Sequence, residues 1–159
     1  MYAGGMADDT RWLTAEQQLA WRAYLEADKV LFDALDRQLQ RDADMPHAYY
    51  EILVRLSETE ERSMRMSDLA DATLSSRSRL SHAVARLEER GWVERRDCTT
   101  DRRGQLACLT DKGMAVLVDT APKHVGAVRS LVIDVLSDEQ LTQLGQISAL
   151  ISKRVAEAG

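Results

Sequence analysis

Residues 66–109 constrain the fold most, because two short helical patterns are followed there by a polar hairpin pattern. The first helix is expected to begin at Ser67, whose hydroxyl can accept hydrogen bonds from backbone N–H groups, and to end near Thr73. After a two-residue turn, a second helix is expected to run to Gly91, since glycine readily adopts the left-handed conformation that ends a helix. Two short helices joined by a tight turn predict a helix-turn-helix.

The second helix has an apolar side and a side with small or cationic residues. Its apolar residues follow the spacing of an amphipathic helix, namely Leu80, Ala83, Val84 and Leu87. The opposite side and its flanks carry Ser78, Arg79, His82, Ala85, Arg86 and Glu89. Small residues permit close approach to a DNA major groove, where arginine and histidine can donate to phosphates and base edges. An ordinary amphipathic helix with a solvated charged face would show the same pattern.

A polar loop between two strand patterns distinguishes these alternatives. Trp92–Arg96 and Gln105–Leu109 flank the segment DCTTDRRG, which predicts a hairpin with a long tip. A narrow cationic tip suits insertion of Arg102 or Arg103 into a minor groove, and Asp101 can hold one of these arginines through a carboxylate–guanidinium pair. A solvated loop with incidental charges is the alternative. The helix pair and the hairpin together outline a winged helix-turn-helix.

The run RMSDLADATLSSRSRLSHAVARLEERGWVERRDCTTDRRGQLACLTDKG resembles the DNA-binding core of the MarR family of bacterial transcription regulators. The LEERGWVER, DRRG and LTDKG segments carry the resemblance, and helical patterns on both sides extend it to nearly the whole chain. The resemblance implies a mainly α-helical fold: a winged helix-turn-helix lobe with a small β-hairpin wing, plus long terminal helices that form a dimerisation region. It places on the DNA-facing helix Ser76, Arg77, Ser78, Arg79, His82 and Arg86, and at the wing tip Arg102 and Arg103.

The distribution of charge agrees with this interpretation. Between Arg62 and Arg103 there are ten arginines and seven acidic residues, a net charge of +3. The whole chain carries −5, so the remainder carries −8. Positive charge is therefore concentrated in the segment expected to meet a polyanion.

Long helices are expected on both sides of this segment. Thr14 to Gln17 is a T-x-x-Q capping box that opens a helix without a break until Arg41. Pro46 suits the first position of a further helix that ends at Ser57. Residues 64–66 are expected to form a short strand that pairs with the wing.

After the wing, Thr110 should cap a helix that runs to about Leu136, with a kink at Pro122. Ser137 to Gln140 is a second capping box, and it opens the last helix. The residues of that helix expected to face inwards are Leu141, Leu144, Ile147, Ser148, Ile151 and Val155.

The domain organisation follows from these elements. Residues 1–11 are expected to be disordered and residues 12–159 to form one MarR-type domain. Its winged lobe would span about 46–110, and its dimerisation helices about 14–41 and 110–157.

The terminal helices carry more apolar surface than one small lobe can cover, which predicts an obligate homodimer. Two-fold symmetry then implies a pseudo-palindromic double-stranded DNA operator with half-sites about one helical turn apart. A monomeric helical bundle is the alternative.

Several functional classes lack support in the sequence. The three histidines, His47, His82 and His124, lie in three different predicted helices without metal-ligand spacing, so we expect neither a metal site nor a cofactor. No nucleophile elbow or glycine-rich phosphate loop occurs, which argues against an enzyme. No apolar run approaches the ~20 residues of a membrane span, and no secretory signal is recognisable. We therefore expect a cytoplasmic protein without a membrane partner, in which His47 and His124 are ordinary surface or pocket residues.

The resemblance also implies a repressor that a small aromatic acid or phenol releases from DNA. Such an effector would bind between the dimer helices and the winged lobe, where the candidate residues are Trp21, Arg22, Tyr24, His47 and Tyr50. Constitutive, ligand-independent DNA binding or an architectural role is an alternative.

Oxidation sensing through an exposed Cys98 is another alternative. A disulfide from Cys98 to Cys108 is not expected. If Arg96 pairs opposite Gln105, about five strand steps or roughly 16 Å separate the two cysteines.

Overall fold

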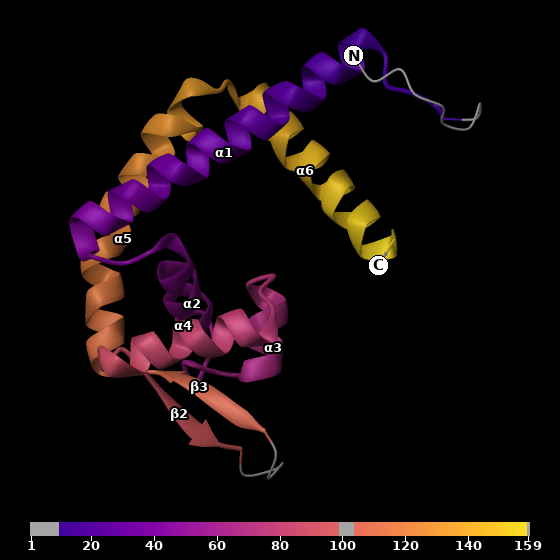
Figure 1. Ribbon diagram of the computed structural model, residues 1–159. Coiled ribbons are helices and arrows are strands. Elements are labelled where there is room, and N and C mark those ends of the chain that lie inside the picture. The colour runs from indigo at the N-terminus through magenta and orange to yellow at the C-terminus, as the bar shows by residue number, and fades with distance from the viewer. Residues whose placement is uncertain (1–9, 99–103, 159) are drawn as a thin grey trace. The chain divides into compact units, whose positions relative to one another are not determined.

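The computed structural model of the chain describes residues 10–98 and 104–158 and is mainly helical, as predicted (Figure 1). In chain order the elements are α1 (Ala15–Ala43), α2 (His47–Ser57), β1 (Ser63–Arg65), α3 (Met66–Ala72), α4 (Arg77–Glu89), β2 (Val93–Asp97), β3 (Gln105–Leu109), α5 (Asp111–Leu131), the 3-10 helix η1 (Ile133–Val135) and α6 (Asp138–Ala158). The chain divides into two compact units, Met1–Ala34 and Leu35–Gly159. The second unit contains the helix-turn-helix and the hairpin.

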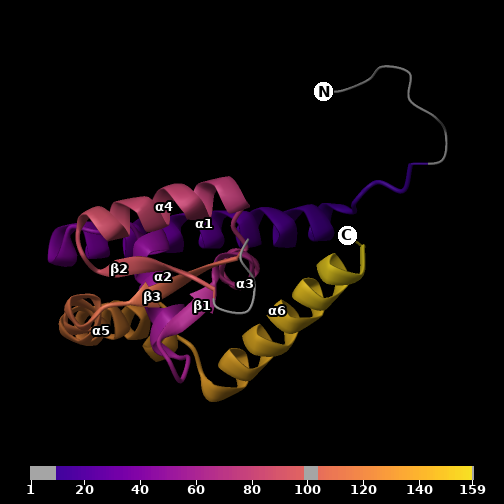
Figure 2. The same ribbon diagram turned by 90° about the horizontal axis from the view of Figure 1, so that it is seen from below.

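A three-stranded antiparallel sheet closes the lobe formed by α2, α3 and α4 (Figures 1 and 2). Its strand order is β1-β3-β2, so the short strand before α3 pairs with the wing, as predicted. It begins one residue earlier than the predicted 64–66, because Met66 already belongs to α3. The apolar stripe of α4 lies in the core, where Leu80, Val84 and Leu87 are at most 2% exposed. They pack in one cluster with buried residues of α2, including Leu53 and Leu56.

The ends of α4 follow local chemistry. The Ser76 hydroxyl accepts a hydrogen bond from the Arg79 backbone N–H at 3.2 Å. At the other end Gly91 has a φ of +71°, which confirms its predicted left-handed conformation. The N–H groups of Gly91 and Trp92 donate to the carbonyl oxygens of Glu88 and Leu87, at 2.8 and 3.0 Å. These two bonds are those of a Schellman ending, and β2 begins at Val93, directly after Trp92.

The predicted start of α3 is wrong by one residue. The helix begins at Met66, after the extended residue Arg65, and its N-cap makes no side-chain hydrogen bond. The Ser67 hydroxyl lies inside the first turn and donates to the Asp68 carboxylate at 3.0 Å. Pairing of β1 with β3 keeps Arg65 extended, so the sheet and not the serine determines where the helix starts.

Both predicted capping boxes are present. The Gln17 N–H donates to the Thr14 hydroxyl at 3.2 Å, and the Thr14 N–H donates to the Gln17 side chain at 3.0 Å. Ser137 and Gln140 make the same reciprocal pair, at 2.9 and 3.2 Å. Each box satisfies backbone donors that a helix start leaves without an intrahelical acceptor.

Three predicted boundaries differ from the structure. The helix α1 continues to Ala43, two residues beyond Arg41. Pro46 is the N-cap of α2 and not its first residue, because its ψ of 151° is extended. The helix α5 ends at Leu131 because the chain tightens into η1 there, before the Ser137 capping box begins α6. Pro122 lies inside α5, and the kink expected there stays a prediction.

The apolar residues of α6 do not face inwards within one chain, which corrects that prediction. No residue of α6 is buried. The exposed large residues of this helix are Leu144, Ile147, Leu150, Ile151 and Val155. A hydrophobic stripe on a well-formed helix, left exposed by its own chain, is typical of a surface that another molecule covers.

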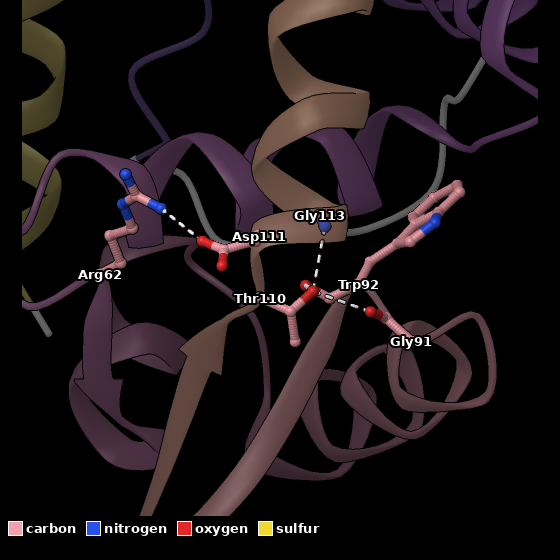
Figure 3. Close-up of polar contacts among 6 residues, drawn as sticks. All are labelled: Arg62, Gly91, Trp92, Thr110, Asp111 and Gly113. Atoms are coloured by element: carbon pink, nitrogen blue, oxygen red, sulfur yellow. Dashed lines mark hydrogen bonds and ion pairs between the residues drawn. The ribbon is translucent and has the colours of Figure 1, made fainter.

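Thr110 joins the wing to α5 (Figure 3). Its hydroxyl accepts from the Gly113 N–H at 3.0 Å, which confirms the predicted cap, and donates to the Gly91 carbonyl oxygen at 2.7 Å. The Thr110 N–H donates to the Trp92 carbonyl oxygen at 3.1 Å. Arg62 and Asp111 form an ion pair at 3.2 Å beside this junction. One threonine therefore holds together the end of α4, the start of β2 and the start of α5.

Candidate nucleic-acid interface

The helix α4 presents the predicted polar side to solvent. All six of its predicted DNA-facing residues are exposed, namely Ser76, Arg77, Ser78, Arg79, His82 and Arg86. Burial of the opposite stripe fixes which side of the helix faces outwards, because the hydrophobic core determines the rotation of the helix about its axis. The contact of these residues with DNA stays a prediction.

The arginines of this lobe differ in whether their guanidinium groups already form an ion pair. Arg86 forms an ion pair with Glu89 at 2.8 Å, and Arg96 pairs with Glu94 on the same strand. Within the described part of the chain, the guanidinium groups of Arg77 and Arg79 make no hydrogen bond or ion pair. These two guanidinium groups lie in the first turn of α4, so they can meet an anion without first leaving a carboxylate.

Arg95 links the wing to α4, which the sequence analysis did not foresee. Its guanidinium donates to the Ser81 carbonyl oxygen at 2.7 Å, and its Nε lies 3.5 Å from a Glu88 carboxylate oxygen. The other Glu88 oxygen accepts from the Arg95 backbone N–H at 3.0 Å. This double contact constrains the angle between β2 and α4, which lie next to one another in the lobe (Figure 2). Spacing could not identify it, since the pair depends on how the hairpin packs.

The turn between α3 and α4 contains a strained residue. Leu74 has a φ of +49° and is 96% exposed. A left-handed backbone conformation is unfavourable for leucine. A hydrogen bond of the next residue maintains this conformation, because the Ser75 N–H donates to the Ala70 carbonyl oxygen at 2.9 Å. The predicted turn at Leu74 and Ser75 lies between the caps Thr73 and Ser76, so four residues separate α3 from α4. The exposed apolar side chain of the turn was not anticipated.

The predicted wing tip, Asp101, Arg102 and Arg103, lies outside the described residues. The strands that carry it are described, and their register corrects the sequence analysis by one residue. Asp97 pairs opposite Gln105, so Arg96 lies opposite Leu106. The expected pairing placed Arg96 opposite Gln105. A slip of one residue would turn the buried side chains of a strand to its other face, so burial of the sheet against the lobe favours the observed register.

The two cysteines are both buried, which contradicts the expectation that Cys98 is exposed. The Cys98 N–H donates to the Gly104 carbonyl oxygen at 2.9 Å, so Cys98 lies opposite Gly104. Cys108 is four residues further along the strand, roughly 13 Å away at the usual rise of a strand. This separation still exceeds the Cα distance that a disulfide tolerates. Burial also raises the pKa of the Cys108 thiol, which keeps that thiol protonated.

The candidate effector residues form two groups. In the first unit Trp21 and Tyr24 stack with ring centroids 5.8 Å apart, and both are about half exposed. Arg22 is exposed beside them. In the second unit the Tyr50 ring lies 4.4 Å, and the His47 ring 5.7 Å, from the ring of His124. Each group lies within its own unit.

His124 was expected to be an ordinary surface or pocket residue, but it is buried, with 7% of its surface exposed. Its Nδ1 lies 2.9 Å from Gln38 Oε1, while Gln38 Nε2 donates to Asp42 at 2.8 Å. Because the Gln38 amide nitrogen faces the carboxylate, its oxygen must accept, and His124 Nδ1 carries the hydrogen. No local pattern of residues indicates this contact, since 86 positions separate Gln38 from His124.

Acidification is expected to destabilise the fold through His124. Burial, and then the nearby His47, lower the pKa of His124 below its ordinary value of 6.5. The unfolded chain therefore binds a proton near pH 6.5 that folded His124 binds only at lower pH, so stability is lost as the pH falls through that interval. Urea unfolding between pH 8 and pH 5 should show this loss. His124→Gln should flatten it, whereas His82→Gln, at an exposed histidine, should not.

Two further groups lie close to His124, and neither changes the sign of this pH response. Tyr50 has a raised pKa because it is buried, so it stays neutral throughout this range. Asp42 contacts the histidine only through Gln38. Equal pH profiles for the wild type and His124→Gln would show that burial of His124 does not perturb its proton binding.

Neither a membrane-spanning helix nor a metal-binding cluster is found among the described residues. No described helix is long and apolar enough to cross a membrane. Over residues 10–98 and 104–158, no group of three or more histidine, cysteine, aspartate or glutamate side chains is arranged to hold a metal ion.

Comparison with known proteins of related sequence or fold identifies transcription regulators. The sequence profile of the MarR family matches residues 43–104. Sco3205, a MarR family transcriptional regulator from Streptomyces coelicolor, has a crystal structure in complex with DNA. It is 58% identical to this chain, and the match covers 91% of each chain with a TM-score of 0.89. AbsC, a second MarR family regulator from the same organism, is 44% identical over 93% of this chain and 99% of its own, also with a TM-score of 0.89.

The transcriptional repressor MprA of Escherichia coli (strain K12) is 34% identical over 103 residues. The match covers 65% of this chain and 58% of MprA, so the chain spans little more than half of that relative.

A helix-turn-helix followed by a sheet-bound hairpin, with a cationic side of the second helix exposed, defines a winged helix-turn-helix protein. The high identity to Sco3205 over almost the entire chain specifies the family. This chain belongs to the MarR family of DNA-binding transcription regulators. The family consists of regulators and not enzymes, which confirms the expectation that the chain is not an enzyme.

Proposed function

We propose that the protein is a homodimeric repressor that binds a pseudo-palindromic double-stranded DNA operator and is released from it by a small molecule. The observation that carries the DNA-binding part is the exposed cationic side of α4, mounted beside the wing strands and held to them by Arg95. Sco3205, the relative of 58% identity, has been crystallised with DNA, and MprA is a repressor. A regulator acts where the DNA lies, so we place this one in the cytoplasm.

The dimer is supported by apolar surface that one chain leaves uncovered. On α6 the exposed residues Leu144, Ile147 and Ile151 follow helical spacing, and on α5 Val118 and Val125 are more than half exposed. Nothing on α6 is buried by its own chain. Burying such stripes between two copies releases about 25 cal/mol for each Å² of apolar surface removed from water, which favours a permanent association.

The dimer would place two copies of α4 at a fixed separation. In each copy, Arg77, Arg79 and His82 would meet base edges and phosphates through the first turns of the helix. Arg86 would exchange Glu89 for a backbone phosphate. Arg102 and Arg103, with Asp101 as support, would enter the neighbouring minor groove from the wing. A symmetric pair of such lobes recognises a palindrome.

The proposed effector is a small aromatic acid or phenol, with Trp21, Arg22, Tyr24, His47 and Tyr50 as its candidate contacts. An effector can release DNA only if it binds more tightly to a dimer whose α4 helices no longer match the operator. Oxidation sensing gains no support, because the Cys98 side chain is buried. A ligand-independent or architectural role would apply if no effector exists.

Release by an effector can be tested directly on the operator complex. Fragments bound by the purified protein are first selected from genomic DNA, and the best one is labelled for fluorescence anisotropy. Titrating a panel of benzoic acids and phenols should release the operator with at least one member, and His47→Ala or Trp21→Ala should weaken that response. The Ala48→Ser variant, at an exposed position next to His47, is the matched control and should respond as the wild type does. No release across the panel would contradict the inducer and leave constitutive repression.

A further inference from the structure

A hollow of about 360 Å³ lies beside α4, and it brings Arg77 together with residues to which no function has been assigned above. Four elements converge on it: β1 contributes Arg65, α3 contributes Ser67, α4 contributes Arg77 and Ser81, and β3 contributes Gln105. Small-molecule pockets of similar size are mostly apolar. Here Met66 is the one large apolar side chain among the described lining residues, so the hollow does not suit an aromatic effector.

The charge of the hollow selects for an anion. Two guanidinium groups line it, those of Arg65 and Arg77. The nearest acidic neighbour in sequence, Asp68, accepts a hydrogen bond from Ser67 but does not line the hollow. Guanidinium and amide donors match the oxygens of a phosphate, which arginine can bind in a bidentate manner. The Ser67 hydroxyl would join them by exchanging the Asp68 carboxylate for the phosphate.

The two arginines are attached to rigid elements. Arg65 pairs opposite Leu106 in the β1–β3 ladder, which fixes its backbone against the wing strand. Arg77 is the first residue of α4, directly after the Ser76 cap. An anion in the hollow would therefore contact the sheet and the DNA-facing helix at the same time. Contacts made by preorganised groups lose little entropy on binding.

We propose that this hollow holds a phosphate of the DNA backbone, next to the groove that α4 enters, and that Arg65 and Ser67 are DNA-contacting residues. The inference rests on the proposed DNA binding and adds two residues that the sequence analysis did not assign. A phosphate held between β1 and the start of α4 fixes the position of the helix along the duplex without recognising a base.

The salt dependence of binding tests this assignment. The logarithm of the association constant falls linearly with the logarithm of the salt concentration, with a slope of roughly −0.9 for each phosphate neutralised. Arg65→Gln should make the slope shallower by about 0.9 per subunit and weaken binding about tenfold per subunit in low salt. The loss should be equal for the selected operator and for unrelated duplex DNA. Arg129→Gln removes the same charge from α5, outside the hollow, and should leave both quantities unchanged.

A second variant separates DNA contact from folding. Ser67→Asp places a carboxylate in the hollow, where it should weaken binding to every duplex at least tenfold. In the first turn of α3 a negative charge favours the helix, so the same variant should keep or raise the melting temperature. A merely structural role for Ser67 would instead change melting and binding together.

The outcomes are distinct. If the wild type binds DNA but Arg65→Gln keeps its slope and Ser67→Asp keeps its affinity, the hollow makes no DNA contact and the inference fails, while the proposed function stands. If inorganic phosphate at constant ionic strength raises the melting temperature of the wild type but not of Arg65→Gln, and the slope is unchanged, the hollow holds a free anion and the inference also fails. If the wild type binds no DNA, the proposed function itself fails.

Discussion

Gly113→Ala is expected to lower the free energy of unfolding by about 3 kcal/mol, because the added methyl group would overlap backbone atoms that cannot move aside. A Cβ at this position would lie 2.1 Å from the Trp92 carbonyl oxygen and 2.8 Å from Leu109 Cδ1. The same carbonyl oxygen accepts the Thr110 N–H at 3.1 Å, so moving it would break the junction between the wing and α5 (Figure 3).

Urea unfolding, followed by circular dichroism, measures the free energy of unfolding of the wild type and of each glycine variant. Gly126→Ala and Gly145→Ala are matched controls, since both glycines lie inside helices and an added Cβ would meet nothing within 4 Å. Alanine stabilises an exposed helix interior by about 0.5 to 1 kcal/mol relative to glycine, so the controls should become more stable. A Gly113→Ala variant as stable as these controls would show that α5 can shift away from Trp92 at little cost.

Ile147→Asp is expected to separate the dimer and to reduce operator affinity more than about 100-fold. The Ile147 side chain is 55% exposed in one chain, within the apolar stripe of α6 that we propose to be covered by the second copy. By symmetry the substitution places two carboxylates in that interface, and an unpaired charge is costly to bury. A monomer would hold one half-site alone and lose the 10²- to 10⁴-fold gain that linked binding sites provide.

Light scattering measures the mass of each variant in solution, and fluorescence anisotropy measures its affinity for the operator. Gln146→Asp is the control, because it adds the same charge one position earlier, at an exposed polar residue off the stripe. It should remain dimeric and bind as the wild type does. The Ile147→Asp lobe should keep its fold, since no residue of α6 is buried within the chain. A dimeric Ile147→Asp variant with normal affinity would place the interface elsewhere.

The sequence predicted best those features whose partners lie within a few residues. The Thr14 and Ser137 capping boxes, the Thr110 cap and the left-handed Gly91 are each completed by atoms at most five residues away. The apolar stripe of α4 was predicted equally well, because its periodicity alone determines which side faces the core.

Predictions failed where a distant segment decides the outcome. Ser67 has the chemistry of a helix cap, but pairing of β1 with β3 starts the helix one residue earlier. Cys98 was expected at an exposed loop, but it lies opposite Gly104 with its side chain buried. In both cases a local preference of about 1 kcal/mol is outweighed by the packing of the sheet.

The sequence by itself determined the order of helices and strands, the cationic side of the second helix and the family, since short-range hydrogen bonds and hydrophobic periodicity are properties of neighbouring residues. Only the tertiary structure decided which arginines are paired, that Arg95 holds the wing to α4, that His124 is buried against Gln38, and that Arg65 and Ser67 share a hollow with Arg77. The Arg95–Ser81 and His124–Gln38 contacts and the hollow join residues 10 or more positions apart. Their geometry depends on how several elements pack at once, and no local pattern of residues encodes that packing.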